Sequence, residues 1–250
     1  MGYHKVEYII SLYEIQGSTR TRSRFCKTWL VACEIFILFR QLLRPRKLRF
    51  SFLGCDEYDV IEPGGGFPTH PHKDAEIFTY VISGELEHRD SMGNGSVIRP
   101  GDLQYMSAGS GVTHSEFNPS TNRATELYQI WMTPNKTGGE PRYAEKELAG
   151  AEKQNGWTLL FSGDGREGST PIRQNAQFLF GRADAETNLS IKPEETLPHA
   201  WIQVVSGALS VANHKLGKAD GLRIENLNAP LNLTINEACS LFLFRLSDNS

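Results

Sequence analysis

Short hydrophobic runs separated by turn residues form the dominant pattern of this chain from residue 56 onward. Residues 76–83 are rich in β-branched and aromatic side chains, and polar and apolar positions alternate after Gly84. Gly-Asn-Gly at 93–95 and Pro-Gly-Asp at 100–102 are typical of tight turns. Regularly spaced short strands with little helical periodicity predict an all-β protein, built as a sandwich or a barrel.

A second strand-rich region, residues 157–246, repeats the pattern of the first. Residues 81–86 (VISGEL) resemble residues 204–209 (VVSGAL), and in both cases an aromatic and apolar strand precedes and an alternating strand follows. Between the halves, residues 134–156 lose the pattern and gain Gly, Pro, Lys and Glu. We expect a connection there, with a short helix around residues 143–149. The chain therefore reads as two related β domains.

Composition narrows the choice of partners. The 250 residues are 39% hydrophobic, which is enough for one large core or two modest ones. A formal net charge of -3 and a pI near 6.2 give no whole-chain electrostatic reason to bind nucleic acid or an anionic membrane. We expect neither of these partners.

Basic residues and cysteines are concentrated near the N-terminus. From Gly17 to Cys55 the chain has nine Arg and Lys but one acidic residue, Glu34, and it holds three of the four cysteines. This distribution does not form a disulfide framework. The apolar stretch 28–39 is too short to span a membrane and contains Glu34. An Arg-rich, acid-poor start also permits an organelle transit peptide.

Four metal-type side chains occur as two pairs with the same spacing, His70 with His72 and His114 with Glu116. Residues two apart in a strand point the same way, so each pair can direct both donors at one point inside a sheet or barrel. Three imidazoles and one carboxylate suit a divalent transition metal. The alternative, isolated polar residues on surface strands, does not explain why all four donors are paired in glycine-rich, strand-like surroundings.

The second half does not repeat these donors. The offset that aligns the two six-residue segments replaces the four donors with Pro193, Glu195, Glu237 and Cys239. His199 and His214 are single histidines, which we interpret as surface or packing side chains. The second half is thus expected to be a duplicated fold that binds no metal.

Four motifs carry a family resemblance: GGGFPTHPH at 64–72, ELEHRDSMGNG at 85–95, RPGD at 99–102 and SAGSGVTHSE at 107–116. They resemble the pirins, which are bicupin proteins. The resemblance implies two tandem jelly-roll-like β-barrel cupin domains, with one metal in the N-terminal barrel held by His70, His72, His114 and Glu116. The expected division is an atypical segment at 1–57, a metal-binding cupin at 58–140, a connection at 141–156 and a metal-free cupin at 157–250.

Bacterial pirins are similar to quercetin 2,3-dioxygenases, so the resemblance implies that O2 opens the central ring of a flavonol with release of carbon monoxide. The metal would be iron(II), with manganese, cobalt, nickel or copper as alternatives. Glu116 is expected to be both a ligand and the nearest base for the flavonol 3-hydroxyl proton, or else a ligand alone. The resemblance also permits a different class, a non-catalytic, iron-dependent redox regulator that binds a transcription or metabolic partner. We expect a cytoplasmic monomer.

Three further features have weaker claims to function. Glu76 follows His72 by four residues, where many cupins have another donor, but in a pirin it is expected to support the site or the fold. His88 is expected to be a hydrogen-bonded polar residue rather than a ligand. Gly109-Ser110-Gly111 is interpreted as a barrel turn rather than a phosphate loop.

The N-terminal segment departs from the family. Pirins begin with His-Gly-Trp-Leu and then Phe-Ser-Phe-Ala-Asn-Tyr-Tyr-Asp-Pro, whereas residues 33–45 here read CEIFILFRQLLRP. Codons for these residues, read one base later, permit the family motif. We hypothesise that residues 13–57 are an out-of-frame translation, which explains the basic and cysteine bias without a transit peptide. Resequencing the gene tests this, and an in-frame reading at high coverage would refute it.

Overall fold

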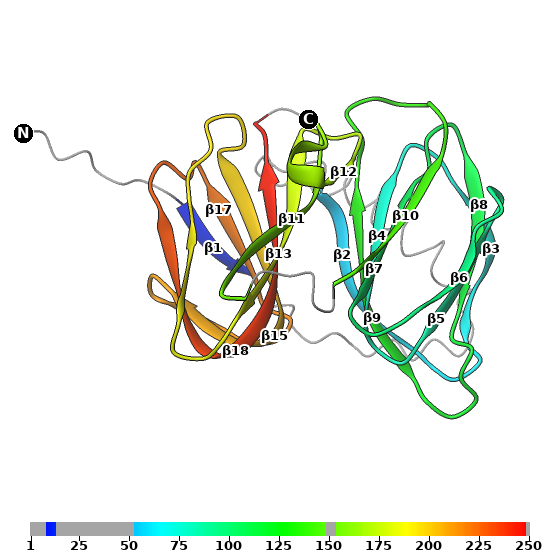
Figure 1. Ribbon diagram of the computed structural model, residues 1–250, viewed down its shortest axis with the longest axis horizontal. Helices are drawn as coiled ribbons and strands as arrows, with labels where there is room; N and C mark the ends of the chain where they lie inside the picture. The colour runs from blue at the N-terminus through cyan, green and yellow to red at the C-terminus, as the bar shows by residue number, and fades with distance from the viewer. Residues whose placement is uncertain (1–8, 14–52, 149–153, 249–250) are drawn as a thin grey trace, which may run out of the picture. The chain divides into compact units, whose positions relative to one another are not determined.

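The computed structural model describes residues 9–13, 53–148 and 154–248. These residues form strands and one short 3-10 turn, which confirms the predicted all-β class. The chain divides into two compact units, one of residues 19–147 and one of residues 1–18 with 148–250 (Figure 1). Among the described residues, no helix is long and apolar enough to cross a membrane. Most of the segment 13–57, with its proposed frame error, lies outside the described residues.

Two antiparallel sheets build the N-terminal unit. The five-stranded sheet has the order β10-β7-β4-β9-β2, with β2 Leu53–Ile61, β4 Glu76–Ser83, β7 Asp102–Ser107, β9 Thr125–Met132 and β10 Arg142–Glu147. The four-stranded sheet has the order β3-β8-β5-β6, with β3 Gly66–His72, β5 Leu86–Asp90, β6 Gly95–Ile98 and β8 Val112–Phe117. Alternation along each strand turns one set of side chains toward the space shared by the two sheets.

The interior of this barrel has two apolar clusters. One draws residues from both sheets: Ile61, Phe67, Val81, Leu86, Ile98 and Leu127. The other comprises Ala75, Ile77, Met106, Ala108 and Val112, with Met92 and Trp131 packed against it. Along β4 the inward positions run from Ile77 through Thr79 to Val81, so a polar residue separates the clusters. The barrel therefore contains a polar layer between two apolar ones.

The prediction of a short helix around residues 143–149 is wrong for residues 143–147, which form part of a strand. Arg142–Glu147 is strand β10 and pairs antiparallel with β7, with Tyr143 opposite Met106. Helix formers such as Ala, Glu and Lys favoured the helix, but propensity is a weak bias that an available sheet edge overrides.

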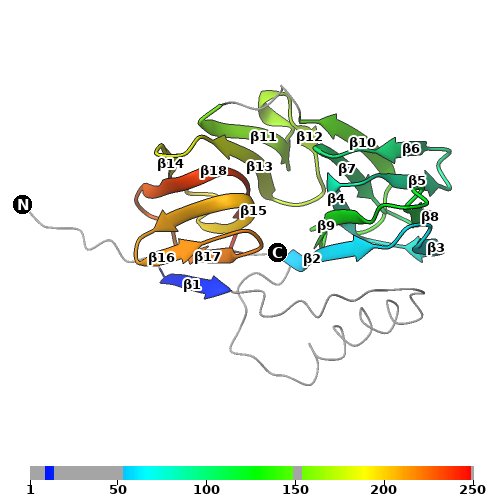
Figure 2. The ribbon, with the colours of Figure 1, turned by 90° about the horizontal axis from the view of Figure 1, so that it is seen from below.

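The C-terminal unit is a second β-barrel with one large sheet (Figure 2). Its elements are β1 Ile9–Tyr13, β11 Gly156–Ser162, η1 Arg166–Gly168, β12 Thr170–Pro171, β13 Ala176–Ala183, β14 Asn188–Ile191, β15 His199–Val211, β16 His214–Leu216, β17 Gly221–Glu225 and β18 Leu231–Leu246. The main path is β1-β17-β15-β18-β13-β11-β12. Buried Leu, Ile, Val and Ala side chains make up most of its core.

Each barrel contains the same tight backbone bend, at Gly84 in the first and at Gly207 in the second, as the sequence repeat predicts. Gly84 and Gly207 have φ of 80° and 79°, a backbone conformation that glycine adopts readily. A Cβ on Gly84 would lie 2.7 Å from the Ala124 carbonyl oxygen, and one on Gly207 would lie 2.2 Å from that of Ala238. In both halves the backbone bends tightly against a neighbouring strand, so the duplication extends to the detail of this bend.

Candidate metal centre

Pairing between β3 and β8 brings the two predicted donor pairs together. His70 lies opposite His114, and Phe67 lies opposite Glu116, with a register irregularity between Phe67 and His70. At Gly66 a Cβ would lie 2.3 Å from the Glu116 carbonyl oxygen, so the close approach of the strands requires glycine there. The irregularity adds one residue to β3 between these two pairs, and it leaves His70 opposite His114.

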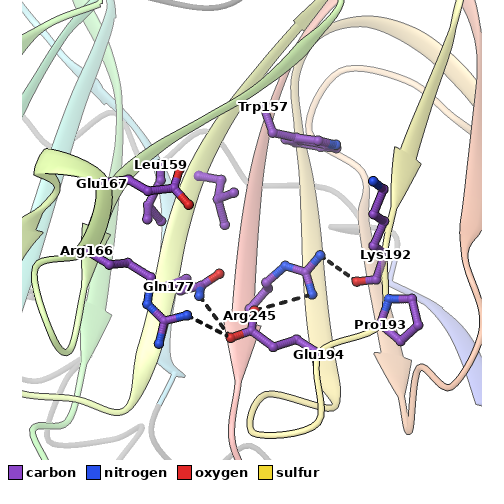
Figure 3. Close-up of a pocket in the computed structure, with 10 residues that line it drawn as sticks. Trp157, Leu159, Arg166, Glu167, Gln177, Lys192, Pro193, Glu194 and Arg245 are labelled. Carbon is purple, nitrogen blue, oxygen red and sulfur yellow. Dashed lines mark hydrogen bonds and ion pairs between the residues drawn. The ribbon is translucent and has the colours of Figure 1, made fainter.

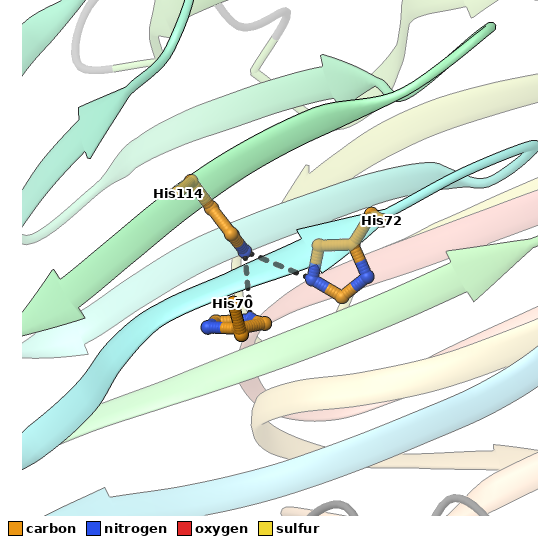
Figure 4. A group of neighbouring side chains, drawn as sticks. All are labelled: His70, His72 and His114. Carbon is orange, nitrogen blue, oxygen red and sulfur yellow. Dashed lines mark hydrogen bonds between the residues drawn. The ribbon is translucent and has the colours of Figure 1, made fainter.

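Three imidazoles converge on one point. The Nε2 atom of His114 lies 3.0 Å from Nε2 of His72 and 3.0 Å from Nε2 of His70 (Figure 4). Two nitrogen ligands at right angles, each about 2.1 Å from a shared metal, would be separated by about 3.0 Å. The spacing therefore fits adjacent positions around one metal ion.

The environment keeps two of these imidazoles neutral. Burial, with the nearby His114 and His70, lowers the pKa of His72 to about 3, although the Glu116 carboxylate opposes the change. Burial, with His70 and His88, likewise lowers the pKa of His114 to about 3. A neutral imidazole has a free lone pair, which is the form that binds a metal.

Hydrogen bonds on the far side of two rings direct Nε2 toward the centre. His70 Nδ1 lies 2.8 Å from the Pro68 carbonyl oxygen, which can only accept, so Nδ1 carries the proton. His114 Nδ1 lies 3.4 Å from His88 Nδ1, and Gln104 Nε2 lies 2.9 Å from the same nitrogen. Partners of this kind fix the tautomer and orientation of metal ligands.

His88 links this network to an acid. Its Nε2 lies 3.4 Å from Oδ2 of Asp90, whose side chain is fully buried. Burial opposes ionisation of Asp90, but hydrogen bonds from Asn94, His88 and Met92 more than offset it and lower the pKa of Asp90. The order Asp90, His88, His114 therefore places a carboxylate at the end of a chain of imidazoles.

Glu116 is buried, with a relative exposure of 2%, and its two oxygens differ. Oε2 accepts a hydrogen bond from Gln129 Nε2 at 3.0 Å, and Gln129 Oε1 accepts one from Trp131 Nε1 at 3.1 Å. Oε1 has no hydrogen-bond partner among the described residues. Because a buried carboxylate oxygen without a partner is costly, this atom suits a cation or a donor that binds from outside the protein.

The four predicted donors fall in two overlapping groups, the second of which also includes His88. His70, His72 and His114 have ligand atoms within 4.8 Å of one another, and so do His88, His114 and Glu116. His114 is common to both groups. A metal ion held by the three imidazoles fits the donor chemistry. Glu116 lies two residues after His114 on β8 and therefore on the same face of that strand.

Sequence reasoning missed the residues that support this centre. The missed residues are Gln104, Gln129, Trp131 and Asp90, together with the supporting role of His88. A sequence signal existed for two pairs of them, because Gln129 with Trp131 and His88 with Asp90 repeat the two-residue spacing of the donors. The ring of Trp131 packs on His72 at a centroid distance of 4.7 Å. The apolar cluster around Ile77 and Met106 thus reaches the centre.

Other expected residues lie elsewhere. Glu76 is fully buried and accepts hydrogen bonds from Tyr105 Oη and from Ser107 Oγ, the latter at 2.5 Å. It shares a face of β4 with Phe78, opposite to the face that carries Thr79. Glu76 is therefore a hydrogen-bonded residue of the fold, outside both donor groups.

The corresponding positions of the second barrel have different surroundings. Glu237 and Cys239 lie in β18, and burial raises the pKa of Cys239 to about 11. Pro193 and Glu195 lie between β14 and β15. His199 is buried, lies 2.7 Å from Asp248 Oδ1 through Nε2, and accepts from the Asn226 backbone, which agrees with a packing role.

Comparisons with known proteins match both halves. The family model described as Pirin matches residues 17–132, and the one described as Quercetinase C-terminal cupin domain matches residues 159–246. The quercetin 2,3-dioxygenase of Escherichia coli K12 is 40% identical over 196 residues, which cover 78% of this chain and 83% of that protein. A pirin-like protein of Caulobacter vibrioides is 32% identical, with 86% and 91% covered.

Solved structures agree with these matches. The crystal structure of the bacterial pirin YhhW from Escherichia coli in complex with nickel(II) has a TM-score of 0.73 and 35% identity, covering 82% of this chain and 88% of that chain. Another structure of YhhW has a TM-score of 0.73 and 38% identity, covering 79% and 82%.

Proposed function

This chain belongs to the pirin family, and from that membership we propose that it is a metal-dependent dioxygenase that opens the central ring of flavonols such as quercetin. The observation that carries the proposal is the convergence of three imidazoles, with His114 Nε2 3.0 Å from Nε2 of both His70 and His72, next to a buried carboxylate with one unpartnered oxygen among the described residues. The name of the Escherichia coli relative, quercetin 2,3-dioxygenase, supports the choice of substrate.

The proposed ligands are His70, His72, His114 and Glu116, with one divalent transition metal in the N-terminal cupin and none in the C-terminal one. Iron(II) is our choice, because histidine and carboxylate ligands with open positions are typical of non-haem iron sites that use O2. Manganese, cobalt, nickel and copper are alternatives, and the nickel(II) in the Escherichia coli pirin structure illustrates one of them. Such an ion supplies Lewis acidity for the flavonol 3-hydroxyl and redox chemistry for O2.

The protein side chains have separate tasks in this proposal. Glu116 Oε1 accepts the proton of the 3-hydroxyl, while Gln129 holds Oε2 in place. Trp131 orients Gln129 through its indole N–H and shields His72 from water with its ring. The apolar side chains around Met106 suit the flat aromatic rings of a flavonol.

The reaction balances with O2 as the oxidant. The two carbon–carbon bonds that flank the hydroxyl-bearing carbon break, that carbon leaves as carbon monoxide, and each neighbouring carbon gains one oxygen atom. One of these carbons becomes an ester carbonyl and the other a carboxyl group. The product is therefore an aryl ester that carries an aromatic carboxylic acid.

Aerobic incubation of iron-loaded protein with quercetin tests the proposal. We expect loss of the flavonol absorbance with one carbon monoxide released per quercetin consumed, and one metal per chain by elemental analysis. His114→Ala should remove both, whereas His214→Ala, the same change at a single histidine of β16, should remove neither. If the wild-type protein binds one metal but turns over no faster than His114→Ala, the regulatory alternative becomes the better explanation.

We also propose that the protein is a cytoplasmic monomer. The scarcity of cysteines after residue 55 and the buried free thiol of Cys239 support a reducing compartment. Size-exclusion chromatography with light scattering tests the oligomeric state.

A further inference from the structure

The C-terminal barrel contains a cavity of about 260 Å³ (Figure 3). Residues of β11, β13 and β18 line it, together with η1 and the segment after β14. Trp157 and Leu179 in its wall pack against the hydrophobic core of the barrel, so these two side chains lie on the interior face of the sheet. All of its lining residues belong to the C-terminal unit.

One wall of the cavity is a fixed aromatic surface. The Trp157 indole lies over Gly181, where a Cβ would be 2.5 Å from Cζ3, and its Nε1 donates a hydrogen bond to the Ser190 carbonyl at 3.1 Å. Both contacts hold the ring in one orientation, and Leu179 extends the apolar surface beside it. A planar ring can stack on such a wall at little conformational cost.

The opposite side presents a largely buried guanidinium. Arg245 has a side-chain exposure of 11%, and its Nη2 donates to the Lys192 carbonyl oxygen at 2.6 Å. Its Nη1 lies 3.9 Å from Glu194 Oε2, which is too long for a hydrogen bond. Since a guanidinium has five N–H donors and one is used in the described structure, Arg245 retains donors for a ligand.

Glu194 marks the position that a carboxylate prefers in this cavity. Its Oε1 lies 3.3 Å from Arg166 Nη1 and accepts from Gln177 Nε2 at 3.2 Å. The lining has three cationic and two acidic side chains, and the Arg166 guanidinium also pairs with Asp164, its Nε lying 2.8 Å from Oδ2. Arg245, which has no carboxylate oxygen within hydrogen-bond distance among the described residues, is therefore the guanidinium that is most open to an anionic ligand.

We propose that this cavity binds a small aromatic carboxylate, with its ring against Trp157 and its carboxylate on Arg245 and Arg166. Bidentate contact with a carboxylate is the strongest interaction open to a guanidinium. The volume lies just below the range of about 300–1,000 Å³ for drug-sized ligands, so it suits a single ring. The product of the reaction proposed above also carries an aromatic carboxylate. A role of the cavity in binding that product rests on the proposed function, whereas binding of a simple benzoate does not.

Isothermal titration of the full-length, metal-loaded protein with benzoate and with 3,4-dihydroxybenzoate tests the site. Each should bind with one-to-one stoichiometry, and benzamide, which has the same shape without the charge, should bind at least about tenfold more weakly because it loses the charged hydrogen bonds. Inorganic phosphate should not compete. Equal binding of benzamide, effective competition by phosphate, or no binding of benzoate at millimolar concentration would each overturn the proposal.

Variants locate the binding. Arg166→Ala, at an exposed position of η1, and Arg245→Gln should each weaken benzoate binding about tenfold, and Trp157→Leu should weaken it without abolishing the preference for the anion. Arg182→Ala, an exposed arginine on β13 that does not line the cavity, is the matched control. Unchanged affinity in a folded Arg166→Ala protein would refute the assignment even if Arg245→Gln fails to fold. His114→Ala should still bind benzoate, which separates this result from that of the quercetin assay.

Discussion

Replacing Gln129 with leucine removes the hydrogen bond that holds one oxygen of Glu116. Gln129 donates to Glu116 Oε2 at 3.0 Å and accepts from Trp131 Nε1 at 3.1 Å, so it connects a predicted ligand to the ring that covers His72. Leucine has a similar volume but neither donor nor acceptor. Oε1 of Glu116 has no hydrogen-bond partner among the described residues, so the variant leaves both oxygens of this buried carboxylate without one.

The size of the effect follows from these contacts. A hydrogen bond to a charged group contributes about 1.5–3 kcal/mol, and a tenfold change in affinity corresponds to about 1.4 kcal/mol. Loss of a hydrogen-bonded support of a metal ligand typically costs about 10–100-fold in affinity. We expect Gln129→Leu to weaken metal binding by about that factor, through a faster loss of the ion.

Competition with a chelator of known affinity measures the change, with bound metal determined by elemental analysis. Gln203→Leu is the matched control, since Gln203 is a fully buried glutamine whose amide donates to the Asp220 carbonyl of the other barrel. Thermal unfolding of both variants checks that they fold. A folded Gln129→Leu protein whose metal affinity stays within twofold of wild type would refute the supporting role of Gln129.

Three further outcomes are expected. The Glu116→Gln variant should bind its metal with an affinity within about tenfold of wild type. Its quercetin turnover per bound metal should fall at least about 100-fold, because a general base has been removed. Unchanged turnover per bound metal would show that Glu116 is a ligand alone. Because burial and neighbouring histidines lower the pKa of His72 and His114 to about 3 from an unfolded value of 6.5, the unfolded chain takes up protons first on acidification. Thermal midpoints of metal-free protein should therefore be highest above pH 6.5 and fall toward pH 4, less steeply in His114→Ala, and an equal pH dependence in the two proteins would contradict this. Gly181→Ala should destabilise the protein by about 1–3 kcal/mol in urea unfolding because its methyl group meets the Trp157 ring, whereas Gly217→Ala, whose Cβ would meet nothing closer than 3.9 Å, should have little effect.

The spacing of the donors was visible in the sequence because alternation along a strand is a local property. The two-residue period of a strand was enough to recognise the pair His70 with His72 and the pair His114 with Glu116. The register that sets His70 opposite His114 depends on an irregularity in β3 and on the close approach at Gly66, which involve a strand more than forty residues away. Such long-range pairing has no local signature.

The error at residues 143–149 has the same origin. The local composition favours a helix, but Arg142–Glu147 lies along the free edge of β7, and Tyr143 stacks on His88 at a centroid distance of 5.1 Å. Its hydroxyl contacts Ser96 Oγ at 2.8 Å. The strand is selected by a sheet edge and an aromatic contact that the local sequence does not encode.

The difference between the two barrels lies in one inner layer. In the first, Thr79 pairs with Gln104 on one side and with Gln129 on the other. The offset of the sequence repeat carries Thr79 to Ile202, which pairs with Leu222 and with Leu243. All three of these residues belong to the hydrophobic core of the second barrel.

An amide buried inside a barrel costs free energy unless each of its polar atoms is satisfied, and apolar residues fill the same space without that cost. In the first barrel the buried amides have partners, because Gln104 contacts His88 and Gln129 donates to Glu116. Both of these partners lie in one group of possible metal ligands with His114. A barrel lined by Ile202, Leu222 and Leu243 offers no such support to a donor, even if one were introduced by mutation. The shared topology therefore permits a metal centre, but the polar layer between the two apolar clusters is what makes the N-terminal barrel suited to hold one.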